Sequence, residues 1–170
     1  SPATQSEKSE DGTCGGVVFC HKPWLQAACP AMASGPAGRD LPEGDIAWKH
    51  FRIKGMQIII AFVYFDHSIG LTGKNLDMVA RLRHLSDNGR VKLIVAGDFN
   101  LSPQQWKDSG LLEILQWTLI TAGSEPTCKT STGSSLIDYI ICDSDVAALV
   151  LNVRIVADVP WGPHFGISFE

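Results

Sequence analysis

The chain has 170 residues, of which 45% are hydrophobic, and it carries 14 Lys and Arg against 18 Asp and Glu, for a net charge of −4. This size allows one sizeable core and is too small for two ordinary domains. The acidic balance excludes the broad positive field of a non-specific DNA-coating protein. It does not exclude an enzyme that grips a few phosphates and holds Mg²⁺ with carboxylates.

No segment predicts membrane insertion or export. The longest apolar run, Met56 to Phe65, is about half of what a bilayer-spanning helix needs and is interrupted by Gln57. The first residue is not Met, and the polar residues 1–12 do not resemble a secretory signal. The five cysteines form no CxxC pair, which argues against a zinc site and favours a reducing compartment. We expect an intracellular protein with no membrane contact.

The first third of the chain predicts little regular structure before a pair of strands. Residues 1–12 read as a disordered polar tail and 13–19 as a short glycine-led strand, and the stretch 21–45, rich in Pro and Gly, reads as a long loop. Residues 46–54 and 56–65 then predict two strands joined by a tight turn at Lys54 and Gly55. The second strand is almost continuously apolar, which is typical of a central strand.

Helices and strands alternate in the rest of the chain. Apolar residues every three positions from Leu76 to Leu85 predict an amphipathic helix over 72–85, ended by Asn88-Gly89. A buried strand over 91–96 runs into Gly97-Asp98-Phe99-Asn100, and a capping box at Ser102 begins a second helix. Further strands are predicted at 135–142, 149–157 and 164–169. This mixture predicts a layered α/β (α+β) fold with its chemistry at the strand ends.

Three polar positions stand out against this framework. Asp98 and Asn100 follow a strand one residue apart, a spacing that suits either an Asx-type turn or a pair of catalytic groups. Asp138 lies between strong strand formers and is either turned outward or buried with a partner. His164 begins the last predicted strand after a Trp-Gly-Pro turn, a fixed position that suits a structural or a catalytic histidine.

Ordered sequence pieces resemble the endonuclease/exonuclease/phosphatase superfamily, whose fold is that of deoxyribonuclease-I-like enzymes. They are Gly-Gly-Val-Val-Phe at 15–19, Val-Tyr-Phe at 63–65, Val-Ala-Gly-Asp-Phe-Asn at 95–100, Glu-Pro-Thr at 125–127, Leu-Ile-Asp-Tyr-Ile at 136–140 and Gly-Pro-His-Phe-Gly-Ile at 162–167. The resemblance implies a sandwich of two mixed β-sheets flanked by helices. It covers most of a single domain at 13–170 that lacks the N-terminal part of the family domain.

The resemblance also implies roles for single residues. Asp98 would orient or deprotonate the attacking water and is a possible metal ligand, and Asn100 would bind a non-bridging phosphate oxygen. Asp138 would pair with His164 and fix its tautomer, and Tyr64 would reach the phosphate or the leaving group.

Departures from the family pattern concern the metal. Glu7 and Glu10 lie in the polar tail, so the family's metal-binding glutamate has no counterpart in this chain. Pro163 stands where the family usually has an acidic residue before the histidine, and His67 stands where it often has asparagine. Because Mg²⁺ prefers oxygen ligands, we expect these changes to weaken its binding.

The sequence therefore predicts a phosphoester hydrolase that depends on Mg²⁺ or Mn²⁺ and resembles repair and retroelement endonucleases, with nucleic acid as its substrate. Two alternatives stay open at this point. The chain could be a catalytically degenerate homologue or fragment that serves as an interaction module. It could also be a lipid or inositol phosphate phosphatase. Its oligomeric state is not predicted.

Overall fold

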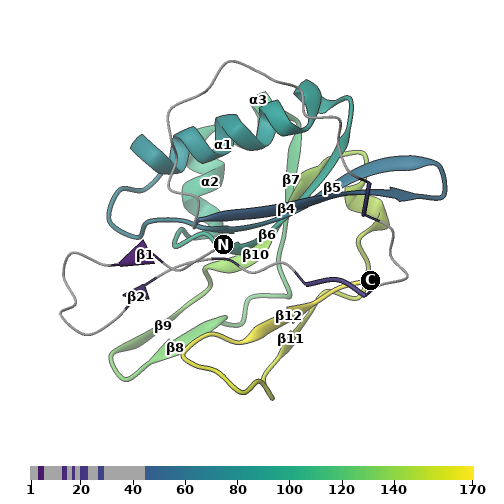
Figure 1. Ribbon diagram of the computed structural model, residues 1–170. Coiled ribbons are helices and arrows are strands. Elements are labelled where there is room, and N and C mark those ends of the chain that lie inside the picture. The colour runs from purple at the N-terminus through teal and green to yellow at the C-terminus, as the bar shows by residue number, and fades with distance from the viewer. Residues whose placement is uncertain (1–3, 6–12, 15–16, 18–19, 23–26, 29–44) are drawn as a thin grey trace.

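A computed structural model describes residues 4–5, 13–14, 17, 20–22, 27–28 and 45–170 of the protein (Figure 1). Its centre is a six-stranded mixed sheet in which β5 and β6 are parallel and all other neighbours are antiparallel. In spatial order the strands are β3 (Ala27–Ala28), β4 (Ile46–Ile53), β5 (Met56–Tyr64), β6 (Lys92–Asp98), β10 (Asp138–Asp143) and β7 (Trp117–Ile120).

The β4–β5 hairpin confirms the two strands and the tight turn predicted from the sequence. Ile53 pairs with Met56, so only Lys54 and Gly55 form the loop. Both have positive φ, 48° and 84°, as a two-residue hairpin turn of this hand requires, and glycine tolerates the second position without strain. The apolar β5 lies between β4 and β6, inside the sheet, as predicted.

Helix α1 (Gly73–Leu85) connects the parallel strands β5 and β6, but its buried face differs from the predicted one. Asn75, Met78, Val79 and Leu82 are buried, whereas Leu76 is 42% exposed. Residues spaced by three positions drift around a helix that has 3.6 residues per turn, so Leu76 lies outside the buried face. Asn75 takes its place because its amide binds three backbone groups of the preceding loop, at Asp66 and Gly70.

The capping box at Ser102 is present at the start of α2 (Pro103–Ser109), as the sequence predicts. Helix α3 (Leu111–Leu115) and strand β7 follow without a glycine or proline between them. The helix ends because Gln116 adopts a left-handed conformation with φ of 56°. Glutamine is not a sequence signal for such an end, and neither α3 nor β7 was predicted.

Two small antiparallel pairs lie beside the main sheet, β8 (Cys128–Thr130) with β9 (Gly133–Ser135), and β11 (Arg154–Val156) with β12 (Gly166–Ser168). The polar β8–β9 hairpin was not predicted. The strand predicted over 149–157 is shortened to β11, because Asn152 has φ of 51° and breaks the extended run. Short 3₁₀ turns occupy Asp87–Gly89 and Ala147–Leu149.

In the N-terminal third, β1 (Thr4–Gln5) pairs with β2 (Thr13–Cys14), and β3 pairs with β4. Most of the predicted tail, first strand and long loop lies outside the described residues, so the predicted domain limits stay predictions. None of the helices in the described part of the chain has the length and apolar character that a membrane crossing requires.

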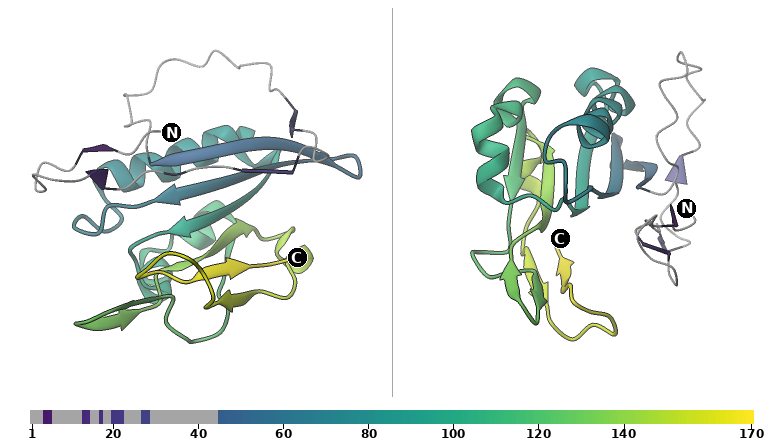
Figure 2. Two further views of the ribbon diagram at one scale, coloured as in Figure 1. Left: turned by 60° about the horizontal axis from the view of Figure 1, so that its bottom comes forward. Right: turned by 90° about the vertical axis from the view of Figure 1, so that its left-hand side faces the viewer.

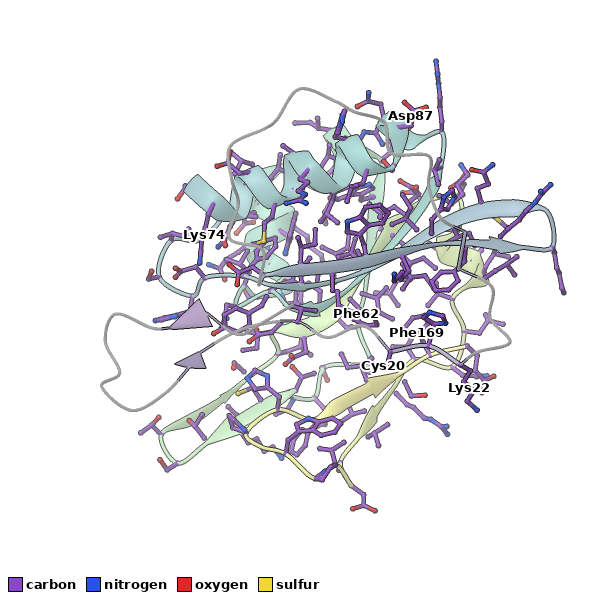
Figure 3. The ribbon with its side chains drawn as sticks, viewed as in Figure 1. Cys20, Lys22, Phe62, Lys74, Asp87 and Phe169 are labelled. Carbon is purple, nitrogen blue, oxygen red and sulfur yellow. The ribbon has the colours of Figure 1, made fainter. Side chains whose placement is uncertain are left out.

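The three helices cover one face of the sheet, and the β11–β12 pair lies on the other side (Figures 1 and 2). The helix face holds the main core, which includes Ala61, Val63, Val95 and Ile141. On the opposite side, Phe62 and Phe169 point into the layer between the sheet and the β11–β12 pair (Figure 3). The mixed sheet with flanking helices confirms the predicted α/β fold class.

Candidate active site

Strand register brings three of the predicted site residues into one row across the sheet. Asp98 ends β6, pairs with Asp138 at the start of β10, and pairs on its other side with Tyr64 at the end of β5. Paired residues of neighbouring strands point to the same face, so these side chains share one edge of the sheet. His164, far away in the sequence, joins this row through its side chain.

The end of β6 is fixed by close packing against β5. At Gly97, φ is 154°, and an added Cβ would lie 2.1 Å from the carbonyl oxygen of Val63, so only glycine allows β5 and β6 to meet here. Directly after β6, Phe99 stacks on Tyr139 with ring centroids 4.6 Å apart. The Tyr139 hydroxyl donates to the carbonyl oxygen of Leu101, 2.8 Å away. Asp98 therefore projects from a rigid frame.

Asp98 forms the Asx-type turn that the sequence left open and also faces the imidazole of His164. Its Oδ1 accepts a hydrogen bond of 2.9 Å from the backbone N–H of Asn100, which closes an Asx-type turn. Its Oδ2 lies 3.7 Å from Nε2 of His164, so the same carboxylate faces the imidazole. Asn100 has φ of 49°, a conformation that asparagine tolerates well.

The Asn100 amide ties the turn to β5. Its Nδ2 donates to the carbonyl oxygen of Phe65 at 2.8 Å and, over a longer distance of 3.3 Å, to Oδ2 of Asp98. These two bonds use both amide protons. The predicted contact with a phosphate oxygen would therefore require the longer bond to be exchanged.

Asp138 and His164 form a direct pair, with Nδ1 of His164 3.1 Å from Oδ1 and 3.0 Å from Oδ2 of Asp138. An ionised carboxylate only accepts hydrogen bonds, so this contact assigns the proton to Nδ1. Nε2 is left facing Asp98. The histidine side chain is 31% exposed, against 14% for Asp98 and 13% for Asp138, so the imidazole is the accessible member of the trio.

Thr127 is the site residue to which the sequence assigned no role, although it lies in the matched Glu-Pro-Thr piece. It is buried, and its hydroxyl donates to Oδ2 of Asp138 at 2.7 Å. The hydroxyl oxygen Oγ1 of Thr127 accepts from the backbone N–H groups of Ile137 and Asp138, which leaves the hydroxyl proton for the carboxylate. A threonine in a loop gives no sequence signal that its hydroxyl is buried, so only the structure identifies Thr127.

The segment that carries Thr127 also holds the histidine in place. The backbones of Cys128 and His164 form an isolated antiparallel β-bridge. On either side of it, the N–H of Lys129 donates to the carbonyl oxygen of Pro163 at 3.0 Å, and the N–H of Phe165 donates to the carbonyl oxygen of Thr127 at 2.8 Å. The backbone of Asp138 is thus held by Thr127, directly before β8, and the backbone around His164 is held by β8 itself. Their side chains meet without depending on a flexible tail.

Burial and a neighbouring charge perturb the titration of Asp98. Burial, followed by the negative charge of Asp138, raises the pKa of Asp98 from 3.8 to about 6. Burial also raises the pKa of the neighbouring Cys128 thiol. A carboxylate that titrates near neutrality is suited to accept a proton from water.

The trio has the spacing of a cation site, because one ligand atom from each of Asp98, Asp138 and His164 lies within 4.8 Å of the others. The donor set decides how a cation would fit. Oδ2 of Asp138 is bonded to both His164 and Thr127, and its Oδ1 lies 3.1 Å from the same nitrogen of His164, whereas Oδ1 of Asp98 accepts only from the backbone N–H of Asn100. Asp98 is therefore the oxygen ligand that these residues offer, which is compatible with Mg²⁺ bound by one carboxylate, water and substrate phosphate.

Comparisons with solved structures support the fold. The endonuclease domain of TRAS1, a telomere-specific non-LTR retrotransposon, is 22% identical with a TM-score of 0.61, and the match covers 74% of this chain and 62% of that domain. The 3'-5' exonuclease NExo from Neisseria meningitidis is 18% identical with a TM-score of 0.53, covering 86% and 70% of the two chains. A mannosyl-6-phosphatase from Bacteroides thetaiotaomicron is 16% identical with a TM-score of 0.50, covering 74% and 55%.

No curated protein matches the sequence significantly. The profile of the endonuclease/exonuclease/phosphatase family matches residues 7–162, a range that includes Tyr64, Asp98, Asn100 and Asp138 and ends just before His164. This match extends over most of the chain, and the fold and the trio agree with it. The chain belongs to the endonuclease/exonuclease/phosphatase family, a group of phosphoester hydrolases.

Proposed function

We propose that the protein is a divalent-metal-dependent phosphodiesterase that cleaves nucleic acid. The observation that carries this proposal is the linked trio, in which Asp138 holds His164 at 3.0 Å and His164 turns its second nitrogen to Asp98. The gap of 3.7 Å between Nε2 and Asp98 is longer than a hydrogen bond. A water molecule or a phosphoryl oxygen beside this gap would be in reach of both groups.

Each residue has a role that its surroundings support. Asp98, with a pKa of about 6, is ionised at neutral pH and accepts the proton of the attacking water. His164 in its protonated form stabilises the negative charge that grows on the phosphoryl oxygens, and Asp138 stabilises that imidazolium. The Asn100 amide keeps Asp98 oriented and donates to the phosphate once its bond to Asp98 is exchanged. Tyr64 lines the same edge of the sheet.

Asp98 would hold the cation, Mg²⁺ or Mn²⁺, which supplies charge neutralisation at the phosphate when bound. Nucleic acid is proposed as the substrate because two of the structural neighbours are nucleases. A further structure of NExo from Neisseria, with a TM-score of 0.54, is bound to a product DNA hairpin.

The test uses two aspartates of the same strand. The purified chain is incubated with single-stranded, duplex and hairpin DNA and with RNA in Mg²⁺, Mn²⁺ or chelator, and compared with Asp138→Asn and with Asp143→Asn at the other end of β10. We expect metal-dependent cleavage that Asp138→Asn abolishes and Asp143→Asn retains. Phosphate release from a soluble monoester or a phosphoinositide, without cleavage of nucleic acid, would show that the site is that of a phosphatase. No turnover with any substrate would favour a degenerate interaction module.

A further inference from the structure

One exposed tryptophan of the described residues lies close in sequence to His164 of the candidate active site. Trp161 is 59% exposed and lies three residues before His164. Among the large hydrophobic side chains exposed in the described part of the chain, it is the only aromatic one, the others being Leu76, Ile114, Leu149 and Leu151. An indole in water loses the burial that usually stabilises tryptophan, so this position needs a reason other than packing.

The backbone around Trp161 is anchored on both sides. Before it, the N–H of Val159 donates to the carbonyl oxygen of Ala157, and Val159 packs so closely on Gly166 that an added Cβ there would lie 3.2 Å from its Cγ1. After it, the carbonyl oxygen of Pro163 accepts from Lys129. The indole is therefore held on a fixed backbone, so binding a ligand through it costs little conformational entropy.

The strand that holds this loop carries a lysine, and its hairpin carries several hydroxyl side chains. Nζ of Lys129 lies 5.5 Å from the centre of the Phe165 ring, one residue beyond His164. The hairpin that Lys129 begins exposes the hydroxyl residues Thr130, Thr132 and Ser134. Figures 1 and 2 show this β8–β9 hairpin next to the β11–β12 pair. Asp158 is the acidic residue of the loop and is exposed to solvent.

We propose that Trp161 is a stacking platform for an unpaired nucleobase close to the scissile phosphate. The Cα atoms of Trp161 and His164 are at most about 11 Å apart, a distance that a short stretch of nucleic acid backbone spans. Lys129 and the hairpin hydroxyls contact the phosphates, and the indole contacts a base. Because bases inside a duplex are already stacked, the platform favours single-stranded or locally unpaired nucleic acid. This inference rests on the proposed function and specifies its substrate.

The experiment measures binding separately from cleavage. Labelled single-stranded oligonucleotides are titrated in chelator, with fluorescence anisotropy as the readout, against the unmodified chain, Trp161→Ala, Trp161→Phe and the control Ile114→Ala. Ile114 is a matched control because it is 74% exposed on α3. In a second series, one base at a time is replaced by an abasic sugar. The same oligonucleotides are also compared with their duplexes.

Stacking on one base predicts that Trp161→Ala weakens single-strand binding by about tenfold, that Trp161→Phe weakens it by less, and that Ile114→Ala has no effect. At one position, the abasic sugar should remove the difference between the unmodified chain and Trp161→Ala. Equal affinity of both proteins for every oligonucleotide would overturn the inference, as would a loss that no abasic position removes. Weakened binding to anionic lipid vesicles alone would assign Trp161 to a membrane surface and would also overturn it.

Failure of this inference differs from failure of the proposed function. Asp138→Asn is expected to stop cleavage and to keep the base-dependent binding through Trp161. If the chain cleaves nucleic acid but shows no base-dependent effect at Trp161, the function stands and the platform is wrong. If base-dependent binding is present without any cleavage, the platform stands and the catalytic proposal is wrong.

Discussion

Strand β10 has an aspartate at each end, and the two are used in opposite ways. At its end, Asp143 is buried and accepts from the backbone N–H of Leu93 at 2.9 Å and from Nε1 of Trp117 at 3.1 Å. At its start, Asp138 shares its carboxylate with Thr127 and His164. Asp143 is bonded only to groups that hold the sheet together. Asp138 is bonded to a side chain that still has a nitrogen free to act.

The comparison shows which property identifies the site. Burial raises the pKa of Asp143 as it does that of Asp98, so a perturbed carboxylate occurs at both ends of the sheet. A cavity of about 940 Å³ lies at the Asp143 end, lined also by Arg83, Lys107 and Gln116. A raised pKa therefore does not separate the two ends, and the lining of this cavity includes none of Asp98, Asp138 and His164. The two ends differ in which groups are hydrogen-bonded to each aspartate.

Breaking the Asp138–His164 pair should have the largest effect. Asp138→Asn and His164→Gln should each lower kcat by about 10²- to 10⁴-fold, because either change removes a stabilised imidazolium. The double variant should cost little more than one single variant, since the two groups act as a unit. Steady-state kinetics of a double-mutant cycle measures this. If the two fold-losses in kcat multiply in the double variant, the residues act independently and the pair has no place in the mechanism.

Changing Thr127 should sharpen the comparison, because it is a positioning residue that acts through Asp138. Thr127→Val removes the hydroxyl donor, and we expect kcat to fall about 10- to 100-fold with KM little changed. Thr127→Ser keeps the hydroxyl and should keep most of the activity. Circular dichroism confirms that both variants are folded. Equal activity of the Val and Ser variants would show that the hydroxyl does not orient the acid.

Acidity should act on Asp98 in two measurable ways. In the metal-free chain the carboxyl is protonated below about pH 6, and a bound cation moves this protonation to lower pH. On that acid limb kcat/KM should fall about tenfold for each further pH unit, because a protonated carboxyl cannot accept a proton, and Asp98→Asn should remove the limb along with most activity. The folded protein also binds this proton more tightly than the unfolded chain does. The free energy of unfolding should therefore decrease as pH rises from about 4 to 6. Denaturant titrations of the two proteins across this range measure the difference, and parallel profiles would count against the raised pKa.

The smallest catalytic effect is expected at the far end of the sheet. Asp143→Ala leaves the N–H groups of Leu93 and Trp117 without their acceptor, and we expect a loss of about 1–3 kcal/mol in the free energy of unfolding. At temperatures below the midpoint of its thermal unfolding, the variant should keep kcat within about twofold of that of the unmodified chain. A large loss of kcat in the folded variant would mean that the two ends of β10 are coupled and that Asp143 is more than a structural residue.

Local sequence signals were sufficient where one short segment defines the structure. Lys54-Gly55 defines a two-residue turn by its φ angles, Ser102 with Gln105 defines a helix start, and an apolar run defines the central β5. The Gly-Asp-Phe-Asn piece marked the end of β6 because its polar residues interrupt a buried strand. The family resemblance added the order of these pieces and thereby the fold class.

Tertiary contacts determined what the pattern could not contain. The β8–β9 hairpin has polar residues with no periodicity, and Gln116 ends α3 in a conformation that is not typical of glutamine. The burial of Asn75 in place of Leu76 follows from three backbone groups in a neighbouring loop. In each case the deciding partner lies in another segment, so its effect on the local conformation is absent from the local sequence.

The sequence by itself indicated the candidate catalytic side chains, namely Asp98, Asn100, Asp138, His164 and Tyr64, because their residue types and order match a family pattern. Only the tertiary structure decided how they are connected. The register of β6 and β10 places Asp98 beside Asp138, and β8 brings Thr127 and His164 to the same carboxylate. Hydrogen bonds are directional and act over about 3 Å. Their partners are therefore chosen by the folded backbone, which brings together residues that lie 11 to 66 positions apart in the chain.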